Sequence, residues 1–179
     1  MSISWRVVPV ACMLTAFSLG VMAHGGAPSR GAAAPAGRAE QTPFGIAGHP
    51  DRAARTIAID MSDAMRFSPS SIRVRSGETV RLRVTNKGAT QHAMVLGTME
   101  DLRRHAELMR RFPDMEHAEP FIAHVAPGGT GEIVWKFNRS GQFRFACLVP
   151  GHLEAGMIGR VVVESRDHQP RISTRSFFR

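Results

Sequence analysis

Three side chains that can bind a metal ion follow one another at even spacing near the end of the chain. Cys147, His152 and Met157 form the pattern Cys-x4-His-x4-Met. One proline and two glycines lie between them, and these residues can supply the bends that fold a loop back on itself. His92 opens a strand-like apolar run and is a fourth donor, carried by a rigid element. The spacing therefore predicts a site built from one loop and one strand.

A thiolate, two imidazoles and a thioether form a donor set that suits both Cu(I) and Cu(II). Two histidines and a cysteine with a weak axial methionine are the ligands of blue-copper electron-transfer sites. Zinc could bind the cysteine and both histidines, although structural zinc sites favour four cysteine or histidine ligands. Each residue alone also has a structural interpretation, as an inert buried cysteine, a hydrogen-bonded strand histidine or a core methionine. Their occurrence together favours copper.

The chain opens with a segment typical of a secretory signal peptide, predicted to span residues 1–23. A basic residue precedes an apolar run that ends at Ala23 and is short for a membrane anchor. Cleavage there would remove Cys12 and leave Cys147 as the single cysteine of an exported chain. Metal ligation would explain how a lone thiol survives in an oxidising compartment. Cleavage would also make His24 the N-terminal residue, and its free amine and imidazole together are a further candidate copper chelate. The alternative is that a histidine occurs there by chance.

Composition divides the remaining chain into three parts. Residues 24–55 are rich in Gly, Ala and Pro, and we expect a disordered linker there. Residues 56–165 have the size of one domain, and residues 166–179 form a basic tail. Much of the formal net charge of +8 lies on the linker and the tail. These basic ends favour contact with an anionic membrane or an acidic partner, and nucleic acid is not expected as a partner of an exported protein.

Alternation of apolar and polar residues dominates residues 56–165. Val80, Leu82 and Val84, for example, are separated by arginines. This period of two indicates half-buried strands. The same pattern recurs around Ile57, Ile72, Trp135, Phe145 and Val161. Turn residues separate the runs, and six or seven short strands of this kind predict an all-β, antiparallel β-sandwich.

One segment breaks the alternation and predicts a helix over residues 99–111, packed on one side of the sandwich. Thr98 can cap it, acidic residues occupy its first turn and arginines its last. Histidines and methionines on and after this helix form a candidate second copper site, because imidazole and thioether donors suit Cu(I). The donors of this candidate second site are His105, Met109, Met115 and His117. The alternative interpretation is that the methionines fill gaps in the core.

The segment from about residue 56 to 164 resembles the cupredoxin family, which includes the plastocyanins and azurins. The resemblance depends on Phe67-Ser68-Pro69, Gly77-Glu78-Thr79-Val80, His92 and the loop from Cys147 to Met157. It implies a cupredoxin-like Greek-key β-sandwich with a short helical insertion at about 99–111. It also implies one type 1 copper ion, with ligands at His92, Cys147, His152 and Met157.

The ligand loop and the helical insertion are most similar to those of bacterial periplasmic cupredoxins associated with copper tolerance. This similarity implies a periplasmic location and one-electron transfer with a redox partner protein, and copper sequestration or storage is the alternative. One departure concerns Ala93, because azurins and plastocyanins usually carry asparagine after the first ligand histidine. We expect no enzymatic activity, because copper oxidases and nitrite reductases need additional histidine-rich copper sites and more than one such domain.

Overall fold

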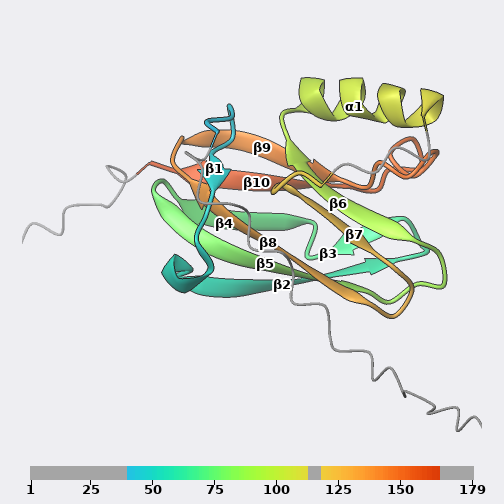
Figure 1. Cartoon of the computed structure of the whole chain (residues 1–179), viewed down its shortest axis with the longest axis horizontal. Coiled ribbons are helices and arrows are strands. Elements are labelled where there is room, and N and C mark those ends of the chain that lie inside the picture. The colour runs from blue at the N-terminus through green and yellow to red at the C-terminus, as the bar shows by residue number, and fades with distance from the viewer. Residues whose placement is uncertain (1–39, 113–117, 166–179) are drawn as a thin grey trace, which may run out of the picture. The chain divides into compact units, whose positions relative to one another are not determined.

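The computed structural model describes residues 40–112 and 118–165, which form two facing β-sheets, one α-helix and one short 3-10 helix (Figure 1). The first sheet has the order β1 (Ile46–Ala47), β8 (Thr130–Phe137), β5 (Glu78–Asn86), β2 (Arg55–Ser62), β3 (Arg66–Ser68). The second has the order β4 (Ser71–Arg75), β10 (Ile158–Glu164), β9 (Gly141–Ala146), β6 (His92–Gly97), β7 (Ile122–Val125). The predicted β-sandwich is therefore confirmed.

The core lies between the sheets and consists of the residues that alternate along the strands. Val80, Leu82 and Val84 of β5 are fully buried, and Trp135 and Phe137 of β8 lie beside them. Side chains of successive strand residues point to opposite faces, so every second residue reaches this core. The period-two pattern in the sequence reports this burial directly.

The expectation of a purely antiparallel sandwich is wrong at two strand pairs. β2 pairs with β5 in parallel, and β4 pairs with β10 in parallel. Alternation of apolar residues records burial of one face and is the same for both strand directions, so the sequence pattern could not decide this point. The chain passes from β2 through the short β3 to β4 in the other sheet, and β5 then returns beside β2 in the same direction.

The expectation of a disordered linker over residues 24–55 is wrong for its last part. Residues 46–47 form β1 on the edge of β8, and Pro50–Arg52 form a short 3-10 helix. Phe44 is 4% exposed and stacks on Trp135 with ring centroids 5.2 Å apart. The indole Nε1 of Trp135 also donates to the carbonyl oxygen of Phe44 at 3.0 Å. One aromatic side chain therefore anchors this segment in the core, although the glycine- and proline-rich composition predicted disorder.

The helical insertion is confirmed as α1 (Met99–Arg111). The Thr98 side chain accepts a hydrogen bond from the backbone N–H of Asp101 at 3.1 Å, as expected of an N-cap. Leu102 and Ala106 pack in a cluster with Val95 of β6 and with residues 146 and 148 around the end of β9. The helix thus covers the second sheet close to the residues that follow β9.

Several predictions lie outside the described residues. These are the signal peptide 1–23, the candidate chelate at His24, linker residues 24–39 and the tail 166–179. Within the two described segments, no helix has the length and apolar character needed to cross a bilayer.

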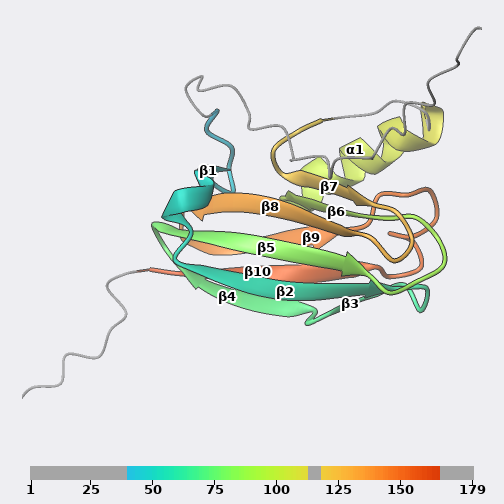
Figure 2. The ribbon, with the colours of Figure 1, turned by 60° about the horizontal axis from the view of Figure 1, so that its bottom comes forward.

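Three connections meet at one end of the sandwich (Figure 2). They are the β2–β3 turn, the β5–β6 loop and the long β9–β10 loop. His92, at the start of β6, contacts Asp63 of the β2–β3 turn and His152 of the β9–β10 loop. This end of the fold positions the candidate site.

Candidate metal centre

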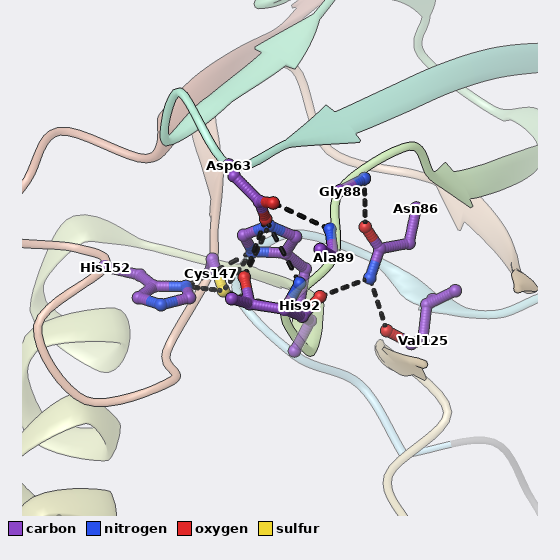
Figure 3. Close-up of polar contacts among 10 residues, drawn as sticks. Asp63, Asn86, Gly88, Ala89, His92, Val125, Cys147 and His152 are labelled. Carbon is purple, nitrogen blue, oxygen red and sulfur yellow. Dashed lines mark hydrogen bonds and ion pairs between the residues drawn. The ribbon is translucent and has the colours of Figure 1, made fainter. Parts of the chain in front are cut away.

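Three of the four predicted donors converge at this end of the sandwich (Figure 3). His92 begins β6, Cys147 directly follows β9, and His152 lies in the β9–β10 loop. The Nδ1 atoms of the two histidines are 3.2 Å apart. The Sγ of Cys147 lies 3.3 Å from Nδ1 of His152 and 3.9 Å from Nδ1 of His92. All three donor atoms lie within 4.8 Å of one another, so one metal ion could contact them all.

The β9–β10 loop closes on itself through backbone hydrogen bonds. The N–H of Cys147 donates to the carbonyl of Met157 at 3.1 Å, and the N–H of Met157 donates to that of His152 at 2.9 Å. Gly151 and Gly156 both have φ of 87°, a conformation that favours glycine, so the expected bends are confirmed. Met157 is fully buried at the end of this loop. The fourth predicted donor is thus tied by its backbone to the other two loop donors.

Cys147 is fully buried and is the one free cysteine among the residues that the structure describes. Burial raises the pKa of its thiol, more than the N–H groups of Ala93 and Val149 lower it. The Ala93 N–H points at Sγ from 3.3 Å. A cation at the three donors would displace the thiol proton, because cysteine binds metals as the thiolate.

The two histidines differ in their access to solvent. His92 is completely buried, whereas His152 is half-buried at the edge of the cluster. Desolvation lowers the pKa of His152, and the neighbouring His92 lowers it further. A neutral imidazole keeps a lone pair for metal binding. The donor set of soft sulfur and neutral nitrogen therefore fits copper in both of its common oxidation states.

Sequence reasoning missed Asp63, which lies in the β2–β3 turn and contacts His92. Its Oδ1 is 3.0 Å from Nε2 of His92. The carboxylate also accepts hydrogen bonds from the Ala89 N–H at 2.7 Å and from the Thr90 hydroxyl at 2.7 Å. These donors, Ala89 first, hold the pKa of the Asp63 carboxyl well below its usual range. Asp63 and His92 are distant in sequence and belong to no common motif, so this contact could not be predicted from the sequence.

A second residue missed from the sequence, Asn86, holds the loop that leads to His92. Its side chain is fully buried at the end of β5. The amide nitrogen donates to the carbonyls of Thr90 and Val125 at 2.8 and 3.0 Å, and the amide oxygen accepts from the Gly88 N–H at 2.9 Å. A buried amide with three satisfied hydrogen bonds fixes the loop geometry. Ala93, which directly follows His92, donates its backbone N–H to the Sγ of Cys147.

Of the four donors of the candidate second copper site, the structure describes His105 and Met109. Met109 is 9% exposed and occupies the buried face of α1 with Leu102 and Ala106, as the core-packing interpretation predicted. His105 lines a groove beside Leu108 and Phe121. Within residues 40–112 and 118–165, the only group of three or more His, Cys or acidic side chains with metal-site geometry is the one at Cys147. Met115 and His117 lie outside the described residues.

The sequence has close relatives among copper proteins. It is 54% identical over 122 residues to the copper-resistant cuproprotein CopI of Rubrivivax gelatinosus, a match that covers 68% of this chain and 74% of the relative. It is 30% identical over 166 residues to the protein of the same name from Pseudomonas aeruginosa, covering 75% of this chain and 90% of the relative.

Solved structures share the fold. Reduced auracyanin from Roseiflexus castenholzii aligns with a TM-score of 0.54 and 23% identity, covering 62% of this chain and 98% of the auracyanin. An azurin from Methylomonas sp. strain J aligns with a TM-score of 0.53 and 19% identity, covering 63% of this chain and 99% of the azurin.

A model of the family described as copper binding proteins, plastocyanin/azurin family, matches residues 53–164. The match spans both sheets from β2 to β10, together with the insertion α1 and the three converging donors. This chain is therefore a member of the plastocyanin/azurin family of copper-binding proteins.

Proposed function

We propose that His92, Cys147 and His152 hold one copper ion, with Met157 as a weak fourth donor, and that the protein transfers single electrons. The observation that carries the proposal is the convergence of the three donor atoms within 4.8 Å. Bound copper would supply a one-electron Cu(II)/Cu(I) couple. The protein would supply the donor set of a type 1 site, which consists of a cysteine, two histidines and a weakly bound methionine.

The burial of the donors suits electron transfer. His92, Cys147 and Met157 are completely buried, and backbone hydrogen bonds close the loop that carries two of them. Such a site would rearrange little between oxidation states. His152 alone among the four reaches partial exposure, so it offers the route by which electrons enter and leave. We propose that a redox partner protein docks over this histidine.

The relatives support a role in copper tolerance. Two proteins at 54% and 30% identity are named copper-resistant cuproproteins. We propose that this protein likewise protects cells against copper, and that it acts in the periplasm after removal of the predicted signal peptide. The basic ends would add contact with an anionic membrane or an acidic partner.

Copper sequestration is the second candidate function, and the same relatives favour it. A storage protein would bind more than one copper ion per chain, using further donors such as His105 and Met109. An electron carrier would bind one ion and cycle it. We propose the carrier, and we propose that the chain is not an enzyme.

Metal counting combined with redox cycling tests the proposal. The protein without its predicted signal peptide is loaded with Cu(II), freed of excess metal and analysed for copper content. We expect one copper per chain, a type 1 electron paramagnetic resonance signal and reversible one-electron reduction. Two or more tightly bound ions would favour storage, and copper that cannot be reduced reversibly would contradict the carrier. Turnover with oxygen or nitrite would contradict the non-enzymatic assignment.

A further inference from the structure

We propose that Asp63 is a positioning residue of the copper site, which fixes the ring of His92 and favours bound Cu(II) over Cu(I). The carboxylate lies on the opposite side of the imidazole from the donor cluster, because it contacts Nε2 while Nδ1 contacts His152 (Figure 3). The inference depends on copper binding at this site. It holds whether or not the protein carries electrons in the cell.

The contact decides which nitrogen of His92 carries the proton. A carboxylate can only accept hydrogen bonds, so Nε2, at 3.0 Å from Oδ1 of Asp63, is the protonated nitrogen. The Thr90 hydroxyl lies 3.4 Å from the same nitrogen and donates its own proton to Asp63. Nδ1 therefore keeps its lone pair and points toward Cys147 and His152. In metal sites, a partner of this kind fixes the tautomer of a ligand histidine and raises its basicity.

The carboxylate is itself held rigidly, as a positioning group must be. Oδ2 accepts from the Ala89 N–H at 2.7 Å, and Oδ1 accepts from the Thr90 hydroxyl at 2.7 Å. Gly88 lets the β5–β6 loop approach closely, because a Cβ at this position would collide with the Asp63 carboxylate. Two connections far apart in sequence are thereby joined at the residue that orients His92.

The negative charge also distinguishes the two copper oxidation states. Cu(II) carries one more positive charge than Cu(I), so a nearby anion stabilises it more. The Asp63 side chain is 40% exposed, and solvent therefore screens part of this effect. We expect Asp63→Asn to lower the affinity for Cu(II) relative to Cu(I) about tenfold. This is the low end of the effects seen when a hydrogen-bond partner of a metal-binding histidine is removed. That ratio corresponds to a rise of about 59 mV in the one-electron reduction potential.

The test compares Asp63→Asn with Asp60→Asn, which removes the same charge from an exposed position on the neighbouring strand β2. We expect Asp60→Asn to change the affinity ratio by less than about twofold, because it is an exposed charge. Asp63→Glu keeps a carboxylate and should recover part of the wild-type potential. A further measurement uses the wild-type protein without metal. Long-range proton–nitrogen correlation spectra of labelled histidine should find the His92 proton on Nε2.

Two results would overturn the proposal. One is a His92 proton on Nδ1 in the metal-free wild type, a measurement that needs no variant to fold. The other is a potential for Asp63→Asn equal to that of Asp60→Asn. Failure of the wild-type protein to bind copper would instead contradict the proposed function, and the tautomer of His92 would still be measurable.

Discussion

Replacement of Phe44 by alanine should destabilise the whole sandwich, because this residue anchors the segment before β2 in the core. Its ring is 4% exposed, stacks on Trp135 at 5.2 Å and meets Phe121 edge-on at 5.6 Å. Phe→Ala in a core costs about 3–5 kcal/mol. The terminal segment can relax around the gap, so we expect about 3 kcal/mol. For a domain of this size that loss lowers the melting temperature by roughly 10 °C.

Thermal and urea denaturation of the metal-free protein would measure this loss. Phe112→Ala is the matched control, because Phe112 is 51% exposed at the end of α1. Its replacement should change stability by less than about 0.5 kcal/mol, as is usual for surface positions. Equal stability of the two variants would contradict this expectation, and would mean that the segment around Phe44 is dispensable for the fold.

Two further substitutions test the acid stability of the fold and the geometry of the ligand loop. The Glu78 carboxyl is partly desolvated, which opposes ionisation, but hydrogen bonds from the Arg55 side chain and the Arg75 N–H lower its pKa below the ordinary 4.5. Glu78 therefore stabilises the fold above about pH 4.5, and this stabilisation is lost as the pH falls through the lower folded-state pKa. Wild type should be more stable than Glu78→Gln in urea at pH 7, and the difference should shrink below pH 4.5; a constant difference would contradict this. Gly156→Ala strains a residue with φ of 87° inside the ligand loop and should cost about 1 kcal/mol together with a several-fold faster release of copper. Gly128→Ala, at φ of 70° with no atom near its Cβ position, should show a similar stability loss with unchanged copper release. Equal release from both glycine variants would argue against a role for the loop geometry.

Features encoded within a short stretch of sequence were predicted correctly. The helix α1 begins and ends where its cap and terminal charges indicated, because these interactions join residues within one turn. The approach of Cys147 and His152 was predictable because one loop carries both residues. The distant His92 was predictable because an imidazole at a strand end completes a known donor set.

Features that depend on contacts between distant segments were missed. Asp63 meets His92 only after the β2–β3 turn and the β5–β6 loop fold together, and an aspartate in a turn is ordinarily explained by the turn itself. The burial of Phe44 could not be predicted from hydrophobic periodicity, because it is a single aromatic residue among glycines and prolines. The parallel direction of β2 and β5 follows from the path of the chain through β3 and β4, which apolar alternation does not record.

Titration with Cu(II), followed by visible absorption in the wild type and in Cys147→Ser, is the sharpest test of whether these side chains bind copper. Serine keeps the size of the buried side chain and removes the sulfur that lies 3.3 Å from His152 Nδ1. We expect intense colour that saturates at one equivalent in the wild type, with the thiol protected from alkylation, and no such colour in Cys147→Ser. A wild type that stays colourless and fully alkylatable with copper present, or a serine variant with the same colour, would contradict the assignment of these side chains as the copper site.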